Sequence, residues 1–126
     1  MAFLLVVDDE TDVLDAMCGA LSAAGHHVLR AAGGLRALDI LDADAQAVDL
    51  LLTDVVMPGL HGFNLSRMAR LRRPEIKVLY ISGYADLAMT VNDTGPRFGK
   101  MLQKPILPEE LCREVREALA AAPVAP

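Results

Sequence analysis

Three acidic residues, one serine and one lysine in this chain have the types and the order that phosphoryl chemistry needs. The acids are the adjacent Asp8 and Asp9, and Asp54 further along. Carboxylates that gather at one place repel one another unless a cation lies between them. Mg²⁺ prefers oxygen ligands and is commonly held by one or two carboxylates together with phosphate oxygens. The acids therefore predict a Mg²⁺ site, with one of Asp8 and Asp9 binding the ion directly and the other through water.

The serine and the lysine, Ser82 and Lys104, extend this hypothesis to a phosphoryl group. A carboxylate can act as a nucleophile and carry an acyl phosphate, so Asp54 is the candidate phosphoacceptor. Negative charge on the three outer phosphoryl oxygens has to be neutralised during transfer. The cation can take one oxygen, the Ser82 hydroxyl a second and the Lys104 ammonium a third. Taken singly, each residue has an ordinary explanation as a helix-start acid, a turn residue or a surface lysine, so the hypothesis depends on the combination.

Five short apolar runs predict the strands that would position these residues. They cover residues 3–7, 28–32, 48–53, 76–81 and 100–103. Such uninterrupted runs are typical of strands buried on both faces, as in a parallel sheet covered by helices. Right-handed crossovers then produce an open sheet. We expect an α/β fold, a single doubly wound (βα)5 domain over residues 1–121, followed by an Ala/Pro tail or linker stub over residues 122–126.

Helices are expected between and after these strands. Apolar residues recur at helical spacing over residues 14–21, 35–41, 63–69 and 107–119. A shorter helix is expected over residues 85–93, close to a Thr-Gly-Pro turn. Arginines surround the third stripe, and we interpret them as a solvated face. They are Arg67, Arg70, Arg72 and Arg73.

The candidate residues follow the predicted strands. Ligands of open α/β sheets bind in the crevice at the carboxyl ends of the strands. Asp8 and Asp9 follow the first predicted strand, and Asp54 follows the third. Ser82 and Lys104 follow the fourth and fifth strands. The fold is therefore expected to bring these side chains to one edge of the sheet.

Composition indicates one globular domain in a reducing compartment. The chain has 126 residues, 53% of them hydrophobic, and a formal net charge of -5, which disfavours direct nucleic-acid binding by this domain. Cys18 and Cys112 lack a metal-binding spacing and are expected to be free, buried thiols. The N-terminus lacks the basic residues of a signal peptide, and no apolar stretch is long enough to span a membrane. We expect a cytoplasmic protein without membrane association.

Four segments of the chain, taken together and in order, resemble the receiver domain of two-component response regulators, the chemotaxis type. The segments are VVDDE at residues 6–10, DVVMPG at residues 54–59 followed by Gly62, ISGY at residues 81–84, and KP at residues 104–105. The resemblance extends over the chain as far as residue 121. It implies a flavodoxin-like fold with a five-stranded parallel sheet of order 2-1-3-4-5.

The resemblance implies roles for the residues of the site. Asp54 would be the phosphoacceptor and a Mg²⁺ ligand. Asp9 would bind Mg²⁺ directly, and Asp8 would act through water. The backbone carbonyl of Val56 would be the remaining protein ligand.

Further roles follow from the same resemblance. Ser82 and Lys104 would contact the phosphoryl group, and Ser82 would also move as part of the switch. The family often has a cis peptide bond before the proline that matches Pro105, and X-Pro bonds tolerate the cis form. We therefore expect a cis bond between Lys104 and Pro105.

A partner and an output are implied as well. The chain would accept phosphate in a bacterial two-component phosphorelay from a histidine kinase or a histidine phosphotransfer domain. It would assist its own phosphorylation and dephosphorylation as a signalling protein rather than as an enzyme. The charge would bias a two-state element, and the face of the fourth helix, fifth strand and fifth helix would contact a downstream protein or a covalently linked domain. We expect a monomer or a weak dimer.

Two positions depart from the family pattern or add to it. Met101 stands where the family usually has Tyr or Phe, three residues before the lysine. Met is flexible, so we expect its side chain to be partly exposed and to report activation poorly. Tyr84 lies two residues after Ser82, where a side chain can gate water, and we expect it to affect the lifetime of the phosphate.

Several alternatives remain open from the sequence. A nucleotide or flavin domain of similar topology would need a Gly-rich loop after the first strand, where this chain has acids. A hydrolase with an aspartyl-phosphate intermediate commonly has a second acid two residues after the nucleophile, where this chain has Val56. A receiver that serves only as a docking module, without phosphorylation, would be expected to lack one of the site residues. A receiver excised from a hybrid histidine kinase is also compatible with the sequence.

Overall fold

The computed structural model describes residues 2–83 and 95–125. Along the chain its elements are β1 Phe3–Val7, α1 Thr11–Ala23, β2 His27–Ala31, α2 Gly34–Asp44, the 3₁₀ helix η1 Ala45–Ala47, β3 Leu50–Asp54, α3 Gly62–Arg72, β4 Lys77–Ser82, β5 Met101–Gln103 and α5 Pro108–Ala120. The strands form one parallel sheet in the order β2-β1-β3-β4-β5. The predicted α/β fold and the sheet order 2-1-3-4-5 are confirmed.

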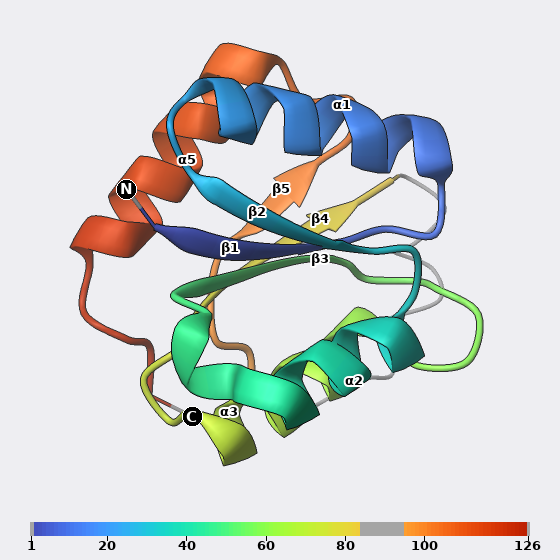
Figure 1. Cartoon of the computed structure of the whole chain (residues 1–126), viewed down its shortest axis with the longest axis vertical. Helices are drawn as coiled ribbons and strands as arrows, with labels where there is room; N and C mark the ends of the chain where they lie inside the picture. The colour runs from blue at the N-terminus through green and yellow to red at the C-terminus, as the bar shows by residue number, and fades with distance from the viewer. Residues whose placement is uncertain (1, 84–94, 126) are drawn as a thin grey trace.

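The sheet is covered on both faces by helices. Figure 1 shows α1 and α5 on one face and α2 and α3 on the other. Alternate residues of a strand point to opposite faces. Accordingly, Leu4 and Val6 of β1 pack in the core beside α1 and α5, whereas Leu5 and Val7 pack in the core on the α2 and α3 side. Burial on both faces explains why the strands read as continuous apolar runs.

The predicted strands are confirmed with shifts of one or two residues at their ends. β3 begins at Leu50 rather than at residue 48 because Val48 still belongs to the turn of η1, where its N–H donates to the carbonyl oxygen of Ala45 at 3.1 Å. β4 runs on to Ser82, so this candidate residue ends the strand rather than following it. The four long helical stripes correspond to α1, α2, α3 and α5. The short helix expected over residues 85–93 lies outside the described residues.

The interpretation of the arginines around α3 as a solvated face is wrong for Arg70 and Arg73. Arg70 donates from Nε to the carbonyl oxygen of Ile76 at 2.8 Å and from Nη1 to that of Val124 at 2.5 Å. Arg73 donates from Nη1 to the carbonyl oxygen of Gln46 at 3.2 Å. These contacts tie α3 to the segments before β3 and β4 and to the C-terminal tail. They stabilise the edge of the sheet opposite the carboxyl ends of the strands.

Two predictions from composition are tested directly. Both thiols are free, with Cys18 buried as expected and Cys112 only partly buried. In the two stretches of chain that the structure describes, every helix is too short or too polar to span a membrane.

Candidate functional site

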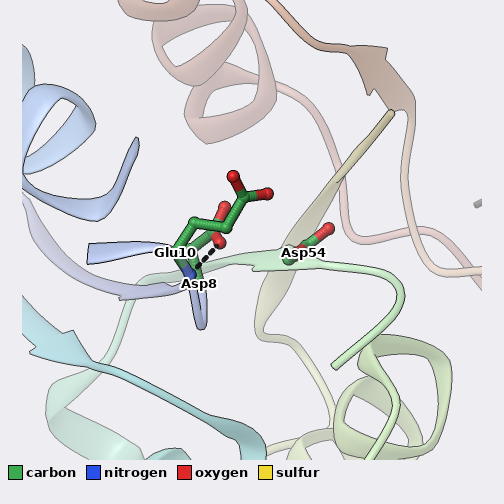
Figure 2. Close-up of side chains that lie close together, drawn as sticks. All are labelled: Asp8, Glu10 and Asp54. Atoms are coloured by element: carbon green, nitrogen blue, oxygen red, sulfur yellow. Dashed lines mark hydrogen bonds between the residues drawn. The ribbon is translucent and has the colours of Figure 1, made fainter. Parts of the chain in front are cut away.

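Two of the predicted acids meet at the carboxyl edge of the sheet, together with a third acid. Figure 2 shows Asp8 and Glu10 from the end of β1 beside Asp54 from the end of β3. One carboxylate oxygen from each of the three lies within 4.8 Å of the others. Asp8 and Asp54 are buried, whereas Glu10 is exposed. The parallel sheet brings them together because β1 and β3 are hydrogen-bonded neighbours.

The backbone fixes the position of Asp8. Its N–H donates to the carbonyl oxygen of Ala31 at the end of β2, at 3.2 Å. Its Oδ1 accepts a hydrogen bond from the N–H of Glu10 at 2.8 Å, which is drawn as the dashed line in Figure 2. An aspartate that bonds the backbone two residues on turns the chain sharply. This turn ends β1 and begins α1.

Asp54 is held by the loop that follows it. Its Oδ1 accepts a hydrogen bond from the N–H of Val55 at 2.9 Å. Gly62 returns to the same place, because its N–H donates to the carbonyl oxygen of Val55 at 2.8 Å. A Cβ at Gly62 would lie 2.1 Å from the carbonyl oxygen of Asp54, so only glycine allows this close approach. The loop therefore fixes the carboxylate at the edge of the sheet.

Lys104 joins the acids into one charged group. Its Nζ lies 2.9 Å from Oδ2 of Asp8, 3.2 Å from Oε1 of Glu10 and 3.3 Å from Oδ2 of Asp54. Burial of the ammonium disfavours its charge, but the hydrogen bond with Asp8 and the charge of Asp54 outweigh that effect and raise the pKa of Lys104 above its ordinary value. Lys104 is therefore a permanent cation in this site.

β5 places this ammonium. The backbone N–H of Lys104 donates to the carbonyl oxygen of Ser82 at 2.8 Å, which holds the end of β5 beside the end of β4. The peptide bond between Lys104 and Pro105 is cis, as predicted. The side chain of Ser82 is buried at the same edge.

The other predicted residues have mixed placements. Asp9 is exposed and is not one of the three acids that gather here. Val56 is partly buried in the loop directly after Asp54. Met101 is 38% exposed, which confirms the predicted partial exposure. Tyr84 lies outside the described residues.

Glu10 was not among the metal ligands predicted from the sequence. Glu10 directly follows Asp9 in the sequence, and the family pattern assigns the metal-ligand role to Asp9. The feature that places Glu10 is the turn between β1 and α1. Asp8 accepts a hydrogen bond from the N–H of Glu10, and a carboxylate oxygen of Glu10 lies within 4.8 Å of those of Asp8 and Asp54, although Glu10 and Asp9 are both exposed.

The site suits a hard divalent cation. The three gathered acids supply only oxygen donors, which Mg²⁺ prefers. The buried Oδ2 of Asp8 is paired with the ammonium of Lys104 at 2.9 Å. With three carboxylates and one ammonium, the group carries about two negative charges, which one divalent cation would balance. An acidic pocket with a lysine is typical of a receiver domain's phosphoacceptor site.

Comparison with known proteins agrees with this geometry. Residues 4–116 match the family model described as the response regulator receiver domain. The chain belongs to this family of signalling proteins. Membership favours a receiver over the nucleotide-domain and hydrolase alternatives raised by the sequence.

Two relatives differ greatly in length. The chain is 34% identical to the response regulator receiver protein CpdR of Brucella abortus over 122 residues, which cover 97% of this chain and 100% of CpdR. It is 38% identical to the sensor kinase CckA of the same organism over 119 residues, which cover 94% of this chain but only 12% of CckA. This receiver sequence therefore resembles both a complete short protein and one part of a much longer one.

Solved structures show the same fold. A receiver domain protein from Clostridium thermocellum superposes with a TM-score of 0.84 at 27% identity, covering 94% of each chain. The receiver domain of the hybrid histidine kinase CckA superposes with a TM-score of 0.79 at 34% identity, covering 94% of this chain and 99% of that domain.

Proposed function

We propose that this receiver domain accepts a phosphoryl group on Asp54, with Mg²⁺, and uses the added charge as a signalling switch. The observation that supports this most directly is the position of Lys104. Its ammonium lies 3.3 Å from a carboxylate oxygen of the buried Asp54 and 2.9 Å from one of Asp8. A fixed cation beside a buried carboxylate is what stabilises the charge that arrives with a phosphoryl group.

The proposed transfer replaces one bond to phosphorus with another. A carboxylate oxygen of Asp54 attacks the phosphorus of a phosphohistidine on the donor, and a new P–O bond forms as the P–N bond breaks. The imidazole nitrogen keeps the electron pair of the broken bond and leaves as neutral imidazole once protonated. Lys104 compensates one phosphoryl oxygen, and the buried Ser82 supplies a hydroxyl for another.

A bound Mg²⁺ neutralises charge on the transferring oxygens when it is present. By the family pattern, Asp9, Asp54 and the backbone carbonyl of Val56 would hold it directly, and Asp8 would act through water. Of these, Asp8 and Asp54 are already gathered at the edge of the sheet.

The donor is proposed to be a histidine kinase or a histidine phosphotransfer domain. The phosphoryl group adds nearly two negative charges, which bias an existing two-state element. The output face is proposed to include β5 and α5, and it would contact a downstream protein or a covalently linked domain. Similarity to CckA, of which the chain covers 12%, makes a receiver within a hybrid kinase a second setting for the same chemistry.

Incubation with acetyl phosphate and Mg²⁺, followed by intact-mass measurement, tests the proposal. We expect a gain of one phosphoryl group that disappears in Asp54→Ala and in the presence of a chelator. Asp44→Asn, which removes an exposed acid at the end of α2, is the matched control and should keep the gain. A gain retained in Asp54→Ala would contradict the assignment. No gain from acetyl phosphate or from a phosphorylated histidine phosphotransfer domain would favour the docking-module alternative.

A further inference from the structure

β5 is too short to fix its own position beside β4. It has three residues, Met101–Gln103, of which only Leu102 is buried. The register of a strand is set by its pattern of buried side chains, and a slip of one residue moves the strand by about 3.3 Å and turns each side chain to the opposite face. Lys104 directly follows β5, and its ammonium lies 2.9 Å from the carboxylate of Asp8. Such a slip would take the ammonium away from the acids, so residues outside β5 have to hold the strand in register.

Phe98, three residues before β5, is held by β4 and α3. Its side chain is buried, and its N–H donates to the hydroxyl of Tyr80 in β4 at 3.2 Å. Cζ of Arg70 in α3 lies 4.6 Å from the centre of the Phe98 ring, within the range of a cation–π contact. The Tyr80 hydroxyl also lies 2.7 Å from Oγ of Ser66 in α3. Phe98 is therefore fixed against two elements whose positions do not depend on β5.

The next two residues connect this anchor to the strand. A Cβ on Gly99 would lie 1.6 Å from the carbonyl oxygen of Val78, so the backbone of Gly99 meets β4 at a place that has no room for a side chain. The carbonyl oxygen of Lys100 accepts a hydrogen bond from the N–H of Tyr80 at 2.9 Å, and Nζ of Lys100 lies 2.8 Å from the buried carboxylate of Glu114 in α5. The pairing of β5 with β4 starts at the following residue. Residues 98–100 therefore fix the place on β4 at which β5 begins.

We propose that residues 98–100, with Phe98 as the anchor, set the register of β5 on β4, and that Phe98 is thereby a positioning residue for the ammonium of Lys104. Phe98 acts through the strand, because this register brings the N–H of Lys104 to the carbonyl oxygen of Ser82 at 2.8 Å. The inference rests on the proposed function for the role of Lys104 in phosphorylation. The register itself is independent of any phosphoryl group.

The first test reads the register by NMR of the unphosphorylated full chain. The reporters are the cross-strand NOE contacts between β4 and β5, and the solvent exchange of the Lys104 amide, which donates to Ser82. In Phe98→Ala and Gly99→Ala we expect the native contacts to be lost or shifted and the Lys104 amide to exchange at least about tenfold faster. Gly33→Ala is the matched control for Gly99→Ala, because a Cβ at Gly33 would have no atom within 4 Å. We expect this control to leave both reporters unchanged.

The second test reads the consequence for the site as the rate of phosphorylation by acetyl phosphate and Mg²⁺. We expect Phe98→Ala to slow this rate about tenfold or more, because a displaced ammonium no longer meets the transferred group. Phe98→Leu keeps a large apolar side chain and should be slowed less than Phe98→Ala. Leu41→Ala controls for stability, since it also removes a buried apolar side chain, from α2. We expect the folded Leu41→Ala chain to be phosphorylated within about twofold of the unmodified rate.

Native cross-strand contacts and unchanged amide exchange in both Phe98→Ala and Gly99→Ala would overturn the inference. Equal slowing of phosphorylation by Phe98→Ala and Leu41→Ala would overturn it as well, since the effect would then be one of stability alone. A register that moves without any change in the phosphorylation rate would support the anchor but contradict the role of Lys104 in the proposed function. Absence of phosphorylation in the unmodified chain would contradict the proposed function, while the NMR test would still decide whether Phe98 sets the register.

Discussion

Nζ of Lys104 lies 3.3 Å from Oδ2 of Asp54, although the two residues are 50 positions apart in the chain. The hydrogen-bonded pairing of β3 with β4, and of β4 with β5, brings their strand ends to one edge. The ammonium compensates buried negative charge before any phosphoryl group arrives. If the site accepts a phosphoryl group as proposed, Lys104 would serve two purposes, since it offers a cation to the incoming anion and competes with any cation for the acids.

Replacing Lys104 should strengthen Mg²⁺ binding and slow the phosphorylation of Asp54. In Lys104→Gln we expect Mg²⁺ to bind more tightly, because the competing positive charge is gone. We expect phosphorylation of Asp54 to slow by about a hundredfold, because a preorganised donor to the transferred group is lost. An NMR titration measures the first effect, and intact mass over time measures the second.

Arg116→Gln is the matched control for Lys104→Gln, since it removes an exposed cation from α5. We expect the control to behave like the unmodified chain in both measurements. Slower phosphorylation together with weaker Mg²⁺ binding in Lys104→Gln would indicate general damage to the site rather than loss of charge.

Much of the fold could be predicted because burial on both faces leaves a clear trace in the sequence. β1 and β3 are apolar runs whose alternate residues face two separate cores, so strand, parallel sheet and site edge followed from one pattern. The arginines of α3 illustrate the opposite case. Arg70, for example, donates to the backbone carbonyl oxygens of Ile76 and Val124. Every residue has such a carbonyl group, so the sequence does not show which of them an arginine will contact.

The site itself was only partly predictable for a similar reason. Asp8, Asp54 and Lys104 were found because strand ends converge in any doubly wound sheet. Glu10 gathers with Asp8 and Asp54 after a turn in which its N–H donates to Asp8. Spacing along the chain does not determine which side of such a turn each side chain takes.

Gly62→Ala should destabilise the domain and displace Asp54. The added Cβ would lie 2.1 Å from the carbonyl oxygen of Asp54 and 3.1 Å from Cα of Val55, so the loop after β3 would have to move. We expect a loss of about 1–3 kcal/mol in the free energy of unfolding, measured by urea denaturation, and slower phosphorylation of Asp54.

Gly19→Ala is the control for Gly62→Ala. Gly19 lies inside α1, and a Cβ there would have no atom within 4 Å. We expect this substitution to raise the free energy of unfolding by up to about 1 kcal/mol, because alanine favours a helix more than glycine. Equal stability of Gly62→Ala and the unmodified chain would show that the loop after β3 adapts freely.

Tyr80→Phe should lower stability through a single buried hydroxyl. Tyr80 is fully buried in β4, its hydroxyl lies 2.7 Å from Oγ of Ser66 in α3, and it accepts a hydrogen bond from the N–H of Phe98 at 3.2 Å. Phenylalanine keeps the ring but leaves that N–H without its partner. We expect a loss of about 1–3 kcal/mol in the free energy of unfolding.

Ser66→Ala distinguishes between the two contacts of the Tyr80 hydroxyl, one with Ser66 and one with Phe98. Removal of the Ser66 hydroxyl deletes the link between α3 and β4, together with the bond within α3 that Oγ of Ser66 donates to the carbonyl oxygen of Phe63 at 2.7 Å. We expect Ser66→Ala to cost less than Tyr80→Phe, because it leaves the bond from Phe98 in place. The reverse order in urea denaturation would assign the stabilisation to α3 rather than to the segment before β5.

Met101 should contribute little to switching. Its side chain is 38% exposed on β5, in register with the fully buried Tyr80 of β4, so the interior beside it is already filled by a fixed aromatic ring. A flexible thioether gains little by moving inward against such a neighbour. We expect the methyl resonance of Met101 to shift little when beryllofluoride and Mg²⁺ are added, and Met101→Ala to phosphorylate at an unchanged rate. The methyl resonance of Met17, buried in α1, serves as the internal reference. A large shift of the Met101 methyl group that shows new contacts with the interior would mean that this side chain rotates inward on activation, as an aromatic residue at this position would.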